Sequence, residues 1–159
     1  MNPTNTGYYV LYVDDEDNAL FFFEKGLKKD FNTITSSSAE SAYEILKERS
    51  KEIAIVITDQ RMPGDHGIDL LKHLRANYPD IIRLLTTAYS DLEEAIDSVN
   101  QGEVYRYIKK PWNINELKTE LKRALELFIM QKERDRLLQQ CPCLSSRARF
   151  HYTGNHNKN

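Results

Sequence analysis

The chain has 159 residues, and its 22 basic and 24 acidic side chains give a formal net charge of −2. This length fits one domain of ordinary size with a tail, and the mixture of both signs leaves no basic patch that favours direct nucleic-acid binding. No apolar stretch approaches the roughly 20 residues that cross a bilayer, and the polar N-terminus has no signal-peptide pattern, so we expect a cytoplasmic protein that does not enter a membrane.

Short apolar runs alternate with segments of helical spacing along the first four-fifths of the chain. Strands are predicted at residues 8–13, 31–35, 53–58, 81–86 and 104–108. A helix is predicted after each of them, beginning near Ala19, Ala42, Ile68, Asp91 and Ile114. Strands and helices in this alternation require parallel pairing with right-handed crossovers, so helices cover both faces of one sheet. The pattern therefore predicts a doubly wound α/β fold.

Polar side chains spaced as caps mark the start of two of these helices. Ser37 and Glu40 are spaced as a capping box before the second helix, and Asn113 with Glu116 has the same spacing before the fifth. These pairs predict where the two helices begin.

The last helical pattern is longer than a small domain needs. It continues without Gly or Pro from Ile114 to Gln140, about 40 Å at 1.5 Å per residue. Its first half has leucines that can pack on the sheet, whereas residues 129–140 are largely charged. We predict that residues 129–140 extend the helix into solvent as a possible coiled-coil linker, and that residues 141–159 are disordered because they lack periodicity and large apolar content.

Chemically active side chains follow four of the predicted strands, at the edge where doubly wound sheets bind ligands. Asp14 and Asp15 follow the first strand, Asp59 the third, Thr87 the fourth and Lys110 the fifth. Three converging carboxylates repel one another unless a cation compensates them, and oxygen-only ligation suits Mg²⁺, with Mn²⁺ as the substitute. The sequence thus predicts a divalent metal site with a hydroxyl and an ammonium beside it.

Asp59 stands alone on its loop and is the candidate nucleophile, because a carboxylate can attack phosphorus to give an acyl phosphate. Asp14 and Asp15 would then hold the metal. Lys110 and Thr87 would contact phosphoryl oxygens, as a point charge and as a hydrogen-bond donor. Pro111 redirects the chain after Lys110, with a cis bond as one option.

Four stretches resemble the motifs of the receiver domain of two-component response regulators, in that family's order: Val13-Asp14-Asp15-Glu16, Thr58-Asp59-Gln60-Arg61-Met62-Pro63-Gly64, Leu85-Thr86-Thr87-Ala88-Tyr89 and Tyr107-Ile108-Lys109-Lys110-Pro111-Trp112. The resemblance covers about Tyr8 to Phe128 and assigns residues 1–128 to such a domain. It implies a flavodoxin-like, five-stranded parallel sheet of order 2-1-3-4-5 with five helices, the last one extended.

The resemblance also implies a function. A histidine kinase or phosphotransfer protein would donate a phosphoryl group to Asp59, with Mg²⁺ held by Asp14 or Asp15, Asp59 and the Arg61 carbonyl. Tyr107 would turn inward when Thr87 moves toward the phosphoryl group. The domain would assist only its own phosphorylation and slow dephosphorylation, so we do not expect an enzyme.

The output is expected on the last helix-strand-helix face, because Thr87 and Tyr107 lie on its two strands. This face or the extended helix would contact a partner, an effector domain or a second copy in a homodimer.

Other interpretations remain open at this point. A receiver-like interaction module that never carries phosphate is one, although the complete set of acids and the lysine argues against it. A Mg²⁺-dependent phosphohydrolase would have a second Asp where Arg61 stands, and a flavin-binding protein would not place Asp14 and Asp15 in its phosphate loop. Singly, Thr87 is a strand-end hydroxyl that can bond to backbone, Lys110 a surface lysine and Tyr107 a packing residue.

Overall fold

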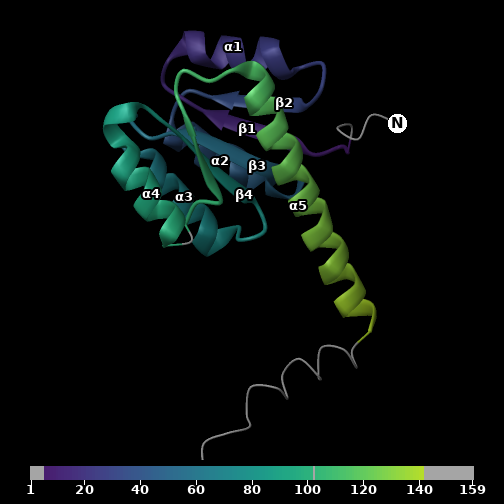
Figure 1. Cartoon of the computed structure of the whole chain (residues 1–159). Helices are drawn as coiled ribbons and strands as arrows, with labels where there is room; N and C mark the ends of the chain where they lie inside the picture. Colours follow the sequence, from purple (N-terminus) through teal and green to yellow (C-terminus); the bar gives the residue numbers. More distant parts are fainter. Residues whose placement is uncertain (1–5, 102, 142–159) are drawn as a thin grey trace, which may run out of the picture. The chain divides into compact units, whose positions relative to one another are not determined.

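A single sheet organises this computed structural model, which describes residues 6–101 and 103–141. Within these residues the sheet has five parallel strands in the order β2-β1-β3-β4-β5. The strands are β1 (Tyr9–Val13), β2 (Asn32–Ser36), β3 (Ile53–Asp59), β4 (Ile82–Thr87) and β5 (Arg106–Lys109). The predicted doubly wound, flavodoxin-like sheet of order 2-1-3-4-5 is confirmed (Figure 1).

Helices connect the strands as the alternation predicts. The five α-helices of the described residues are α1 (Asp17–Leu27), α2 (Ala39–Arg49), α3 (Gly67–Asn77), α4 (Leu92–Asn100) and α5 (Ile114–Gln140). Two short 3₁₀ turns, η1 (Ser50–Glu52) and η2 (Tyr89–Asp91), precede β3 and α4. Asn113 caps α5 as predicted, because its Oδ1 accepts the backbone N–H of Asn115 at 2.8 Å.

The predicted cap of α2 is wrong by one residue. The N-cap is Ser38, whose Oγ accepts the Ser41 backbone N–H at 3.1 Å, and not Ser37 paired with Glu40. Strand β2 runs through Ser36, in register with Val13 of β1, and the Ser36 hydroxyl donates to the Ser38 carbonyl at 2.9 Å. Because pairing with β1 carries the strand this far, the helix begins one residue later.

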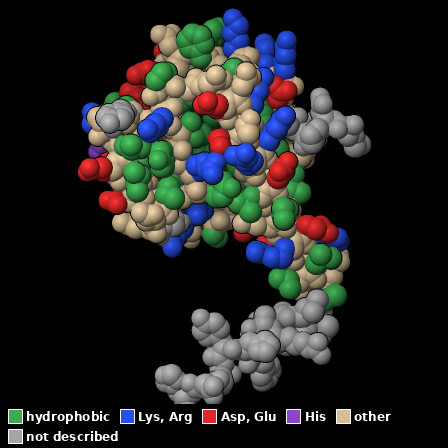
Figure 2. Space-filling view, viewed as in Figure 1, with side chains coloured by type: hydrophobic (Ala, Val, Ile, Leu, Met, Phe, Trp, Pro, Cys, Tyr) green, Lys and Arg blue, Asp and Glu red, His purple; other side chains and the backbone are tan. Residues whose placement is uncertain are grey.

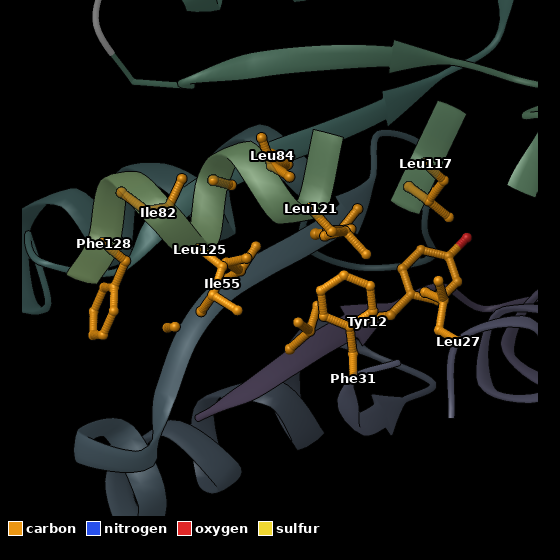
Figure 3. Packing of buried hydrophobic residues seen from close by; sticks show 14 of the residues in the cluster. Tyr12, Leu27, Phe31, Ile55, Ile82, Leu84, Leu117, Leu121, Leu125 and Phe128 are labelled. Carbon is orange, nitrogen blue, oxygen red and sulfur yellow. The ribbon is translucent and has the colours of Figure 1, made fainter. Parts of the chain in front are cut away.

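Two hydrophobic clusters lie on opposite faces of the sheet. The face covered by α1 and the first half of α5, here called the aromatic face, buries Tyr12, Phe23, Phe31 and Phe128 among aliphatic side chains. Figure 3 shows Tyr12, Phe31 and Phe128 among the aliphatic residues. The face covered by α2, α3 and α4, here called the aliphatic face, has only aliphatic and methionine side chains in its buried cluster. The side chains of β1 alternate between the two faces, as pleating requires. In β3, the successive residues Ala54 and Ile55 both join the aromatic-face cluster, where the register with β1 shifts.

The chain divides into two compact units between Phe128 and Ile129. The first contains the sheet and both clusters. In the second, α5 continues to Gln140, as predicted, and exposes several large apolar side chains, namely Ile129, Met130, Leu137 and Leu138. The coiled-coil role of residues 129–140 stays a prediction, and the disorder expected for residues 141–159 falls, apart from Cys141, outside the described residues.

The surface carries both charge signs. On the face shown in Figure 2, basic and acidic side chains are interspersed, as the near-neutral net charge predicts. Of the helices that the structure describes, none combines the length and the apolar character that crossing a membrane requires.

Candidate functional site

The ends of β1 and β3 bring three carboxylates together. Val13 pairs with Thr58 in the parallel ladder, so the residues that follow, Asp14 and Asp59, lie side by side. One carboxylate oxygen from each of Asp14, Asp15 and Asp59 lies within 4.8 Å of the others. Asp14 is fully buried, Asp15 is exposed, and the Asp59 side chain keeps 14% of its surface exposed. The cluster is thus anchored at Asp14, open to solvent at Asp15 and partly accessible at Asp59.

Lys110 reaches this cluster from the end of β5. Its backbone N–H donates to the Thr87 carbonyl at 2.9 Å, and the peptide bond to Pro111 is cis, the option considered from the sequence. The Lys110 Nζ lies 2.8 Å from Asp14 Oδ2 and 3.1 Å from Asp59 Oδ1. Burial acts to lower the pKa of Lys110, but hydrogen bonds and attraction from the two carboxylates outweigh it and raise that pKa. The ammonium therefore stays charged.

Asp59 has opposing influences on its ionisation. Burial raises the pKa of its carboxyl, the charge of Lys110 lowers it, and the charge of Asp14 raises it again, with a net upward shift. The Thr86 Oγ1 also lies 3.5 Å from Asp59 Oδ1, because Thr86 is the β4 residue that pairs with Asp59. The carboxylates thus repel one another, and a cation beside them would reduce this repulsion.

The donor set fits a divalent cation. Asp14, Asp15 and Asp59 offer carboxylate oxygens only, which is the ligand type that Mg²⁺ prefers. Three acids share one lysine, so further positive charge is favourable there. These three residues would hold the ion, together with the Arg61 carbonyl that the resemblance to receiver domains implies.

In the described structure, no hydrogen bond joins the side chain of Thr87 or of Tyr107 to Asp59. The buried Thr87 hydroxyl donates to the Ala88 carbonyl at 3.1 Å. Tyr107 is half-buried and packs against the cluster of the aliphatic face. The roles of Thr87 as phosphoryl contact and of Tyr107 as switch stay predictions. The hydrogen bond of Thr87 to a backbone carbonyl is the other interpretation that the sequence left open for this residue.

The turn after β3 connects the site to α3 and α4. Gln60 is buried, and its Nε2 donates to Glu94 Oε2 at 2.8 Å while its Oε1 accepts the Ile68 backbone N–H at 3.2 Å. The Arg61 guanidinium lies 2.6 Å from Asp91. A charged cleft of about 500 Å³ between α3 and α4 lies beside these pairs. Asp59 is thereby tied to α4 through its immediate sequence neighbours.

Gly67 allows α3 to begin against the end of β3. A Cβ at this position would collide with the carbonyl oxygen of Asp59. The glycine is therefore required for close approach of helix and strand.

Two residues of the site were missed by the sequence analysis. Tyr12 and Thr86 both sit at alternating strand positions that are typical of core packing, yet each hydroxyl contacts an acid of the cluster. The alternation of side chains along a strand could have indicated the contact of Tyr12. Tyr12 and Asp14 are two residues apart and therefore project from the same side of the chain.

Comparison with known proteins agrees with this geometry. Residues 10–122 match the family model of the response regulator receiver domain. The chain is 35% identical over 128 residues to the hydrogenase transcriptional regulatory protein HoxA of Cupriavidus necator, which covers 80% of the chain and 26% of that protein. The chain spans about a quarter of the length of the curated relatives it matches.

Two solved structures have the same fold. A structure described as adenylate cyclase from Rhodopirellula baltica superposes with a TM-score of 0.79 at 27% identity, over 84% of this chain and 98% of that one. A response regulator receiver domain protein from Clostridium thermocellum gives a TM-score of 0.69 at 28% identity, over 79% of this chain and 97% of that one. The likeness therefore covers the sheet and its helices.

Proposed function

This chain belongs to the family of response regulator receiver domains, and from that premise we propose that Asp59 accepts a phosphoryl group in a Mg²⁺-dependent reaction. The donor is a histidine kinase or a phosphotransfer protein. One observation carries the proposal: Lys110 Nζ lies within 3.1 Å of Asp59 Oδ1, inside a cluster of three acids. An accessible carboxylate beside a fixed ammonium is the arrangement that aspartyl phosphorylation needs.

Asp59 acts as the nucleophile. One carboxylate oxygen forms the new O–P bond while the P–N bond of the donor's phosphohistidine breaks, and the leaving nitrogen keeps the bonding electron pair. Lys110 opposes the effect of burial on the pKa of Asp59 and so favours the ionised, nucleophilic form. Its ammonium is positioned to meet negative charge on a phosphoryl oxygen. Bound Mg²⁺ supplies positive charge that offsets repulsion between the acids and the phosphoryl group.

The output follows from a change of partner at Thr87. Its hydroxyl donates to the Ala88 carbonyl here, and we assign the exchange of that acceptor for a phosphoryl oxygen as the switching step. Tyr107 then turns toward the space near Thr87. Phosphorylation adds about −1.5 to −2 charges at Asp59. Inverting a 1:99 equilibrium between two conformations takes about 5.5 kcal/mol. The metal and the two charge-assisted contacts of Lys110 and Thr87 approach this free energy.

The surface formed by α4, β5 and α5 reports this change to a partner, to an effector domain or to a second copy of the chain. Homodimerisation through this surface or through residues 129–140 belongs to the same proposal. The chain converts no other substrate and assists only its own phosphorylation and slow dephosphorylation.

Mass spectrometry tests the phosphoacceptor directly. With a small phosphodonor and Mg²⁺, the wild type gains roughly 80 Da, the mass of HPO₃, and Asp59→Asn gains nothing. Asp65→Asn, which changes an exposed acid in the turn after β3, is the matched control and keeps the gain. Equal labelling of Asp59→Asn and wild type contradicts the assignment, and no labelling of either favours an interaction module that works without phosphate.

A further inference from the structure

Tyr12 carries the one polar side-chain group among the buried residues of β1. Its side chain has 0% exposure, and the residues beside it in β1, Val10, Leu11 and Val13, are all apolar. A buried hydroxyl is unfavourable unless it is hydrogen-bonded. The Tyr12 hydroxyl donates to Asp14 Oδ2 at 2.5 Å, so its acceptor is an acid of the site.

The ring of Tyr12 is fixed by two other aromatic side chains. It stacks on Phe23 of α1 with centroids 4.4 Å apart, and meets Trp112 edge-on at 5.6 Å. Trp112 follows the Lys110–Pro111 bond, so these contacts also pack the loop that carries the lysine. Rings held on two sides have little freedom, and the hydroxyl is therefore aimed at Asp14 by packing.

Asp14 holds its orientation through donors on both carboxylate oxygens. Oδ1 accepts the Glu16 backbone N–H at 3.0 Å, whereas Oδ2 accepts both the Tyr12 hydroxyl and the Lys110 ammonium, the latter at 2.8 Å. In the proposed function a phosphoryl oxygen competes with Asp14 for the Lys110 ammonium. Tyr12 then remains as the side-chain donor of the described structure that keeps Oδ2 in place.

We propose that Tyr12 is a positioning residue for the divalent cation, holding the Asp14 carboxylate by a hydrogen bond from within the aromatic face. The inference rests on the proposed function in one respect, that the cation binds at Asp14, Asp15 and Asp59. Partners that orient a metal-ligating side chain typically change metal affinity by about 10- to 100-fold when removed. Tyr12 thus links cation affinity to the packing of α1 and the Lys110 loop.

Tyr12→Phe tests the inference, because it removes one oxygen and keeps the ring contacts. Mg²⁺ titration is followed by fluorescence of Trp112, the only tryptophan of the chain, and independently by calorimetry. We expect Kd for Mg²⁺ to rise about tenfold or more. Tyr8→Phe is the matched control, since this ring also packs on the aromatic face, against Phe128 at 4.8 Å, but away from the acids. Its Kd should equal that of the wild type.

A second measurement separates positioning from folding. In an Asp14→Asn background, Tyr12→Phe should no longer change the Mg²⁺ affinity, because the carboxylate that it orients is gone. A change of the same size in both backgrounds overturns the inference, as does a Kd for Tyr12→Phe within twofold of the wild type. If the wild type itself binds no Mg²⁺, the metal site of the proposed function is wrong, which is a distinct result.

Discussion

The two faces of the sheet hold the functional site in different ways. On the aromatic face, Tyr12, Phe23 and Trp112 contact one another and reach both Asp14 and the loop of Lys110. On the aliphatic face, the site is connected to α4 through polar pairs, Gln60 with Glu94 and Arg61 with Asp91. The aromatic face fixes Asp14 and the loop of Lys110 by packing. The aliphatic face connects the site to α4 by hydrogen bonds and ion pairs, which water can replace.

Helix α4 shows what the difference means. It buries only Ala95 and Ser98, whereas α3, on the same face, buries three leucines. Few buried apolar contacts and polar links that are partly exposed are features of segments that open or move at low free-energy cost. We infer that the aromatic face keeps the acids and lysine in position, and that the α4 side of the aliphatic face is where a response begins.

Phe23→Ala should break this arrangement most severely. The side chain has 0% exposure and stacks on Tyr12, so its removal leaves a cavity and is expected to lower the free energy of unfolding by about 3–5 kcal/mol. Urea denaturation measures the loss. Phe21→Ala on the same helix is the control, since that ring is 60% exposed and its loss should change stability by less than about 0.5 kcal/mol. Equal effects would contradict the role given to the aromatic face.

Gly67→Ala tests whether a change on the aliphatic face alters the proposed reaction of Asp59. The added Cβ collides with the Asp59 carbonyl, so we expect a loss of about 1–3 kcal/mol together with slower phosphorylation. Gly64→Ala is the control: its φ of +84° disfavours alanine, but the space around it is open. That variant should lose about 1–2 kcal/mol and keep its phosphorylation rate. Normal phosphorylation of Gly67→Ala would show that the strand adapts.

The pH dependence of stability measures what burying Asp59 costs without metal. Burial, its largest influence, raises the pKa of Asp59, so the folded state binds the proton more tightly than the unfolded state. Stability is therefore lost as pH rises from the usual Asp value of about 3.9 through the raised value. Asp59→Asn should be more stable than the wild type at pH 7, and the difference should shrink toward pH 4.

The same two proteins, the wild type and Asp59→Asn, can be compared with and without Mg²⁺. Because it binds the folded protein, adding it should stabilise the wild type more than Asp59→Asn, as melting temperatures in chelator and in Mg²⁺ would show. If the wild type were more stable than Asp59→Asn in chelator at pH 7, the attraction of Lys110 would outweigh the effect of burial on the pKa of Asp59.

Glu94→Ala should have the smallest effect on stability and a selective effect on motion. It removes the acceptor of Gln60 Nε2, and a loss of about 1 kcal/mol is expected. Amide hydrogen exchange should become faster in α4 and stay unchanged in α1. Glu93→Ala, a neighbouring exposed change in the first turn of α4, should leave both helices unchanged. Equal exchange in the two variants would remove Gln60 and Glu94 from the link to α4.

The sequence by itself determined the α/β fold and the site's location. Alternating strand and helix patterns require a parallel sheet, and parallel strands end at one edge, so Asp14, Asp59 and Lys110 could be placed together from their positions after apolar runs. The structure brings them within hydrogen-bonding distance. This part was predictable because strand period and strand ends are local properties.

Only the tertiary structure decided which partner each of these hydroxyl groups contacts. It placed the Thr86 hydroxyl near Asp59 and that of Thr87 on the Ala88 carbonyl, gave Tyr12 a bond to Asp14, and moved the α2 cap to Ser38. The Thr86 contact depends on the register of β4 against β3, and the position of the α2 cap depends on how far β2 pairs with β1. Register arises from packing across the whole sheet, and no short stretch of sequence contains it.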